Sequence, residues 1–131
     1  MVGDLNALRR ADYRDEEWDG IVRARQRAGI ETETELTEQL ERPADAGGWG
    51  LSDCRAVARH VAGATATSVH GARVDYVWIS PAATERWRVL QHVTVDAPML
   101  GHGEADDSQP STDHALVLCV LEEIQEGSRS P

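Results

Sequence analysis

The feature that most constrains the fold is an alternating segment near the middle of the chain. In RVDYVWI, residues 73–79, Val74, Tyr76 and Trp78 alternate with Arg73, Asp75, Val77 and Ile79, and most of these residues favour strands. Successive side chains of a strand point to opposite faces, so Asp75 shares a face with apolar neighbours and should be partly buried. A part-buried carboxylate needs a partner. Arg73, a loop N–H and His114 are the candidates.

Helical signals come before this strand and further strand signals follow it. Spacing and capping residues predict helices from Asp15 to about Gly29, from the Thr32/Glu35 capping box to about Pro43, and from Ser52 through Val61. The chain starts with the end of a strand at Met1-Val2, and β-rich runs predict strands over 87–95 and 114–123. A polar Gly/Pro-rich loop separates these two runs. Helices followed by strands indicate an α/β or α+β arrangement.

Length and charge limit the function classes. The chain has 131 residues, 40% of them hydrophobic, which predicts one small domain. A net charge of −10 disfavours general binding to nucleic-acid phosphates or anionic lipid. The sequence has no long apolar run and no signal-peptide pattern, so we expect a cytoplasmic protein without a membrane span. Cys54 and Cys119 are far apart in sequence, which predicts neither a disulfide framework nor a cysteine zinc site.

Three short motifs carry the candidate chemistry. They are Gly3-Asp4-Leu5-Asn6, the 73–78 segment around Asp75, and Thr112-Asp113-His114. Each places an acid, an amide or an imidazole within or at the end of a strand-like segment, where a rigid element can fix its direction. Hydrolysis of a phosphate ester uses carboxylates for a divalent cation and for water, neutral donors for phosphoryl oxygens, and an oriented imidazole. The residue types therefore predict a single site for that chemistry.

In this order, the motifs resemble those of the endonuclease/exonuclease/phosphatase superfamily, the group that includes deoxyribonuclease I. There a strand ends in Gly-Asp-x-Asn, a later strand carries Arg-[Ile/Leu/Val]-Asp-Tyr, and Ser-Asp-His opens the last core strand; here Thr112 replaces the serine. The resemblance covers residues 3–123. It implies an α+β fold of the four-layer α/β sandwich family, in which this chain is the C-terminal half of a two-sheet β-sandwich flanked by helices. Residues 1–124 would form that portion and 125–131 a flexible tail.

The resemblance also assigns expected roles. Asp4 would position or deprotonate the attacking water, Asn6 would donate to the scissile phosphate, and Asp75 would orient the imidazole. Asp113 would hold the cation together with Asp4, and His114 would contact the phosphate. The implied cofactor is Mg²⁺ or Mn²⁺.

Substrate-binding residues are expected beside these groups. Trp78 is close to Asp75 in sequence and is a candidate for lining the substrate pocket with Asn6 and His114. The acidic charge favours a small phosphomonoester or phosphodiester over a nucleic acid.

The resemblance further implies parts that lie in the family's N-terminal half. These are an early Asn, the main metal-binding Glu and a middle His or Tyr. The expected function is therefore a divalent-metal-dependent phosphoesterase truncated at its N-terminus, or with its other half encoded separately. The alternative is a catalytically inactive remnant or interaction module that pairs with a separate N-terminal half or forms a homo-oligomer.

Simpler interpretations stay open for several of these residues. Asp4 and Asn6 also suit a turn in which side chains bond to the local backbone, and Asp113-His114 also suits a plain turn-to-strand boundary. His60, His70, His92 and His102 show no metal-ligand spacing and are expected at the surface or in packing, and the four tryptophans in the core or as loop anchors. The acidic cluster Glu104, Asp106 and Asp107 is expected to be a solvated loop.

Overall fold

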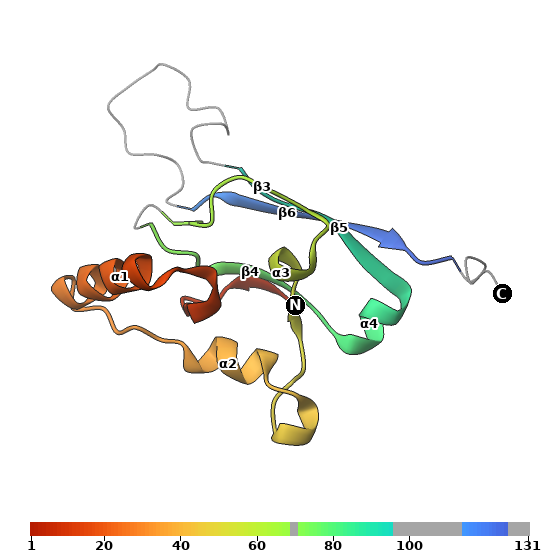
Figure 1. The fold of residues 1–131 in the computed structure, drawn as a ribbon, viewed down its shortest axis with the longest axis horizontal. Coiled ribbons are helices and arrows are strands. Elements are labelled where there is room, and N and C mark those ends of the chain that lie inside the picture. Colours follow the sequence, from red (N-terminus) through yellow and green to blue (C-terminus); the bar gives the residue numbers. More distant parts are fainter. Residues whose placement is uncertain (69–70, 96–113, 126–131) are drawn as a thin grey trace, which may run out of the picture.

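The computed structural model describes residues 1–68, 71–95 and 114–125, and it has an α+β architecture built on two three-stranded sheets (Figure 1). One sheet has the order β1 (Val2–Asp4), β4 (Asp75–Ile79), β2 (Ser52–Asp53), and the other has β3 (His60–Ala62), β5 (Trp87–Val95), β6 (Leu116–Glu123). The α-helices in these ranges are α1 (Asp15–Arg27), α2 (Glu35–Glu41), α3 (Cys54–Val57) and α4 (Pro81–Arg86), and two 3₁₀ helices cover Arg10–Asp12 and Ala44–Ala46. The predicted α+β class is confirmed.

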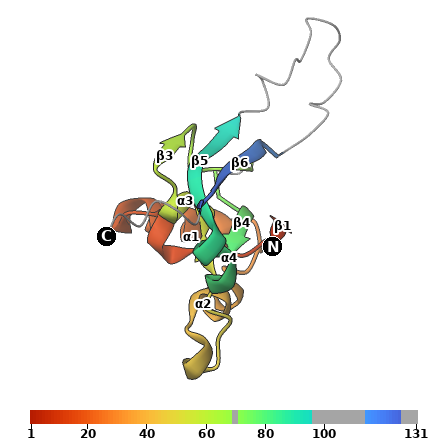
Figure 2. The same cartoon turned by 90° about the vertical axis from the view of Figure 1, so that its right-hand side faces the viewer.

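Strand β4 is the centre of the first sheet, and it is covered on both faces. Its alternation works as the sequence predicts: Tyr76 and Trp78 pack with Leu40 of α2, while Ile79 packs with Val89 of β5. Figure 1 and Figure 2 show the second sheet on one side of β4 and α2 on the other. Both neighbours of β4 run antiparallel to it.

The second sheet mixes strand directions. Strand β3 runs parallel to β5, and β6 runs antiparallel to it along nearly its whole length. The strand predicted over 87–95 is confirmed with the same bounds, and the run predicted over 114–123 forms β6 from Leu116, with an isolated bridge between Ser68 and His114 before it. The short strand β3 was not predicted, because the sequence pattern favours a helix there.

A buried ion pair links the strands of the first sheet. Both terminal nitrogens of Arg73 donate to the Asp53 carboxylate at 2.7 Å, and one also reaches Asp12 at 2.9 Å. The Arg73 and Asp53 side chains are fully buried. Burial by itself raises the pKa of Asp53, but hydrogen bonds and charge from Arg73 outweigh this effect and hold it below its usual value. Arg73 is thus committed to Asp53 and Asp12 rather than to Asp75.

Several local expectations need correction. Helix α1 has Arg14 as its N-cap, and the Arg14 N–H donates to the Glu17 carboxylate. Helix α2 starts at Glu35 after the N-cap Thr34, rather than at Thr32. The predicted 52–61 helix is only α3; its cap is Asp53, which accepts from the Arg55 N–H.

Helix α4 was not predicted. The Ser80 side chain caps it by accepting from the Ala83 N–H, and Pro81 occupies its first turn, where a missing N–H costs nothing. The Ser80-Pro81 pair thus begins a helix between β4 and β5.

The two cysteines, distant in sequence, lie together between the sheets. Cys54 of α3 and Cys119 of β6 belong to one apolar cluster, and both are free thiols. Burial raises the pKa of the Cys54 thiol to about 12, so it behaves as a packing residue. Among the described helices none combines the length and the apolar character needed to cross a bilayer.

Candidate functional site

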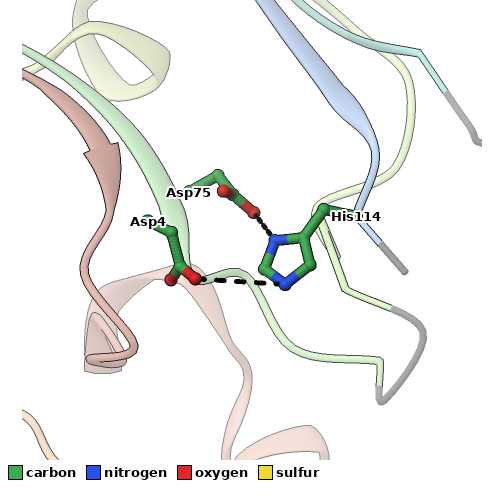
Figure 3. A group of neighbouring side chains, drawn as sticks. All are labelled: Asp4, Asp75 and His114. Atoms are coloured by element: carbon green, nitrogen blue, oxygen red, sulfur yellow. Dashed lines mark hydrogen bonds and ion pairs between the residues drawn. The ribbon is translucent and has the colours of Figure 1, made fainter. Parts of the chain in front are cut away.

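Two of the three predicted motifs and the histidine of the third meet at one end of the first sheet. Asp4 ends β1, Asp75 begins β4, and His114 lies just before β6 (Figure 3). One ligand-type atom from each of the three side chains lies within 4.8 Å of the others. Because Asp4 and Asp75 are directly opposite in the antiparallel register, their carboxylates are close by construction of the sheet.

The Asp75–His114 pairing predicted from the sequence is confirmed as a contact. Asp75 Oδ2 lies 2.8 Å from His114 Nδ1, and the two side chains are 20% and 30% exposed. An ionised carboxylate has no proton to give, so Nδ1–H is the donor when Asp75 is charged. The hydrogen bond therefore fixes the orientation of the ring and directs Nε2 away from Asp75.

Asp4 takes part both in the local turn and in the Asp4–Asp75–His114 group. Its Oδ1 accepts the Asn6 backbone N–H at 2.8 Å, while its Oδ2 lies 4.0 Å from His114 Nε2. Asn6 has φ 52°, in the left-handed region that asparagine tolerates better than most residues. The turn and the site interpretations of this motif are thus compatible, because each carboxylate oxygen has its own neighbour.

A residue that the sequence did not single out holds the group together. Thr67 is 1% exposed, and its Oγ1 accepts the backbone N–H groups of Val74 and Asp75 at 3.0 and 3.1 Å. Its carbonyl accepts the Ala115 N–H at 2.7 Å. Thr67 therefore fixes the start of β4 relative to the residue next to His114. A lone threonine in a polar loop gives no sequence signal for this role.

The donor atoms fit a divalent cation that prefers oxygen. Two like charges directly opposite each other in a sheet repel, so a cation or a protonated imidazole stabilises the Asp4–Asp75 arrangement. One or two carboxylates completed by water and phosphate oxygens are the usual protein ligands of Mg²⁺, and Mn²⁺ accepts the same donors and tolerates imidazole. Asp113, the other predicted metal ligand, lies outside the described residues.

Trp78 is placed apart from this group. It is on the face of β4 opposite to Asp75, 3% exposed, and packed with Leu40 and Tyr76. Alternation along the strand puts positions 75 and 78 on different faces, so the Trp78 side chain belongs to the core and not to the surface where a substrate would meet His114. Asn6, in contrast, lines the same cavity as His114.

The other histidines and acidic residues contribute nothing to this group in the described parts of the chain. His92 is fully buried in β5, as expected for a packing residue, and His60 is exposed. His70, His102, Glu104, Asp106 and Asp107 lie outside the described residues.

Comparisons of the chain with protein-family models, with curated proteins and with solved structures give no match. The site is therefore interpreted from its own geometry and from the three motifs.

Proposed function

We propose that this chain provides part of the active site of a divalent-metal-dependent phosphoesterase of the endonuclease/exonuclease/phosphatase type. The observation that carries the proposal is the Asp4–Asp75–His114 group, in which one carboxylate orients an imidazole through Nδ1 and a second lies 4.0 Å from Nε2 of the same ring. Asp4 lies 71 residues before Asp75 in the sequence, and His114 lies 39 residues after it. The three side chains nevertheless meet in one place, as residues that share a catalytic task must.

Each side chain has a defined task in this proposal. Asp75 keeps the His114 ring in one orientation, so that Nε2 can bind a phosphoryl oxygen as a donor when protonated. Asp4 is 46% exposed at its side chain, so water reaches it, and its carboxylate can accept a proton from that water. The Asn6 amide is a neutral donor for a second phosphoryl oxygen.

The bond changes are those of ester hydrolysis. The water oxygen forms a bond to phosphorus, the ester P–O bond breaks, and the alcohol departs with a proton. A bound Mg²⁺ or Mn²⁺ would be held by Asp4, with Asp113 as the second expected ligand, and would supply charge neutralisation on the phosphoryl oxygens.

The test is hydrolysis of bis(p-nitrophenyl) phosphate by the full chain with Mg²⁺, Mn²⁺ or EDTA. We expect metal-dependent turnover that falls roughly 10²- to 10⁴-fold in His114→Ala and Asp4→Asn. The matched control is Asp19→Asn, which makes the same carboxylate-to-amide change at an exposed residue of α1. This variant should retain activity. Turnover unchanged in both site variants would overturn the assignment.

One observation favours the second candidate, an interaction module that pairs with a separate partner half or with itself. Leu116, Leu118 and Val120 of β6 are 43%, 46% and 46% exposed, and they lie on one face of the strand. Apolar side chains in such a row favour association. Sedimentation of the chain over a range of concentrations tests this: a stable monomer would contradict self-association, and an associating chain that hydrolyses nothing with either metal would favour the module.

A further inference from the structure

A cavity of about 220 Å³ opens directly beside the Asp4–Asp75–His114 group. Asn6 and His114, which the proposed function assigns to the phosphoryl group, form part of its wall. The rest of the wall comes from one face of α1 with its following turn, from Ser68, and from the start of β4. The lining residues in that part are Ile21, Ala24, Arg25, Ala28, Ile30, Ser68, Ala72 and Val74.

The α1 wall follows from helical spacing. Positions 21, 24, 25 and 28 are at i, i+3, i+4 and i+7, so they share one side of the helix. Two of the four are alanine, and their small side chains leave the space that a leucine or phenylalanine would fill. Arg25 is partly committed, because its Nε donates to the Glu31 carbonyl at 3.0 Å.

The opposite wall is rigid and apolar. Val74 and Ala72 are each 4% exposed and pack with Leu8 in a buried cluster, against which Ile21 of α1 also packs. The cavity thus has polar side chains at Asn6, His114 and the neighbouring Ser68, and a mainly apolar body in which Arg25 is the charged lining residue. A molecule with a phosphoryl group at one end and an apolar group at the other matches this distribution.

The volume limits the size of that apolar group. A cavity of about 150 Å³ lined by apolar side chains holds one benzene molecule, so 220 Å³ admits an aromatic ring or a short branched alkyl group. It does not admit a nucleotide chain or a long acyl chain without much of it remaining outside.

We propose that this cavity is the subsite for the alcohol portion of the substrate, and that the chain prefers phosphate esters of small aromatic or branched aliphatic alcohols. This inference rests on the proposed function for the phosphoryl end of the substrate. It goes beyond it by naming the substrate class from the shape and polarity of the neighbouring cavity.

The test compares phenylphosphonate with methylphosphonate, which have the same phosphonate group and cannot be hydrolysed at their P–C bonds. Binding to the full chain is followed by NMR in the presence of Mg²⁺. Burial of the ring should make phenylphosphonate bind on the order of tenfold or more tightly, and it should shift the methyl signals of Ala24 and Ala28. Equal affinities, or no binding of phenylphosphonate, would overturn the proposal.

Two variants at the end of α1 sharpen the test. Ala28→Phe fills the cavity and should lower phenylphosphonate affinity to that of methylphosphonate, whose own affinity should not change. Arg27→Phe adds the same ring at the next position, which does not line the cavity, and should leave both affinities unchanged. Equal loss in the two variants would overturn the proposal, and if Ala28→Phe does not fold, the wild-type comparison of the two ligands still decides.

The two proposals fail in different ways. Phenylphosphonate binding that depends on Ala28, together with no hydrolysis of any ester, would reject the phosphoesterase and keep an apolar ligand site. Metal-dependent hydrolysis without preference for the aromatic ligand would keep the phosphoesterase and reject the subsite.

Discussion

The β1–β4–β2 sheet and the β3–β5–β6 sheet differ in where their apolar and polar side chains lie. In the first, β4 packs apolar side chains on both faces, and the buried charge of Arg73, which precedes β4, is paired with Asp53 and Asp12 through its two terminal nitrogens. In the second, the inward face contains His92 and Thr94, both buried, whose side-chain polar atoms have no hydrogen-bond partner in the described part of the chain. Its outward face presents the apolar row of β6 to solvent.

This difference indicates that the two sheets contribute differently to stability. Apolar burial and a buried ion pair stabilise the first sheet, whereas the second combines apolar packing at Val89 with a buried imidazole and hydroxyl that have no hydrogen-bond partner among the described residues, and it exposes an apolar row on its outer face. The catalytic candidates lie where the two sheets meet, with Asp4 and Asp75 on the first and His114 leading into the second. The site therefore takes two of its three groups from the sheet that contains the buried ion pair.

The largest effect should come from breaking the ion pair of the first sheet. Arg73→Met leaves the buried Asp53 carboxylate unpaired, and we expect the free energy of unfolding to fall by about 3–5 kcal/mol in urea titrations. The control is Arg86→Met, which removes a half-exposed pair with Glu123 and should cost about 1 kcal/mol or less. If the free energy of unfolding falls by a similar amount in the two variants, burial of the Arg73–Asp53 pair does not make it more important for stability than an exposed pair.

The next effect concerns the link between the sheets at the site. Thr67→Val removes the acceptor of two backbone N–H groups, so we expect a loss of about 2–3 kcal/mol in unfolding free energy. The Nδ1 proton of His114 should also lose its hydrogen-bonded NMR signal, because Asp75 is no longer held in place. Thr67→Ser keeps the hydroxyl and should preserve that signal; its loss in the serine variant would mean that the hydroxyl is not what positions Asp75.

Two single variants, one on each face of the second sheet, compare how much the two faces contribute to stability. Val89→Ala removes a side chain that is 3% exposed and packed with Cys54 and Ile79, and it should cost about 2 kcal/mol. Leu118→Thr changes the outward face and should alter the unfolding free energy by only about 0.5 kcal/mol. Chemical denaturation at low protein concentration measures both, and a large cost at Leu118 would show that the outward face is covered in solution.

The smallest effect is expected from replacing His92, whose buried ring nitrogens have no hydrogen-bond partner among the described residues. Burial, and then the charge of Arg73, lower the pKa of His92, so the unfolded chain takes up a proton more readily than the folded one. The free energy of unfolding should therefore fall as the pH decreases below about 6.5, the ordinary value for histidine, and through the lower folded value. His92→Phe should remove this part of the pH dependence and stabilise the fold by about 1 kcal/mol at pH 8.

The control for that measurement is His60→Phe on β3, where the side chain is exposed. It should leave the pH dependence of stability in place. If His92→Phe leaves the fall below pH 6.5 unchanged, another group is responsible for it.

Local pattern by itself determined the elements with the clearest periodicity. The two-residue alternation at 73–79 predicted both faces of β4, and the apolar run at 87–95 gave β5 with its observed bounds. The helical spacing after Asp15 gave α1 to within a residue at its start. These succeeded because period and capping are properties of neighbouring residues, which the sequence contains in full.

Tertiary structure alone decided which groups meet. The motifs predicted that Asp75 needs a partner, but only packing assigned Arg73 to Asp53 and left His114, 39 residues away, for Asp75. The role of Thr67, the cavity beside α1 and the burial of His92 and Thr94 in the second sheet have no signal in composition or spacing. Contacts between distant segments depend on how the sheets stack and on which side chains fill the space between them, and that information is not local to any stretch of the chain.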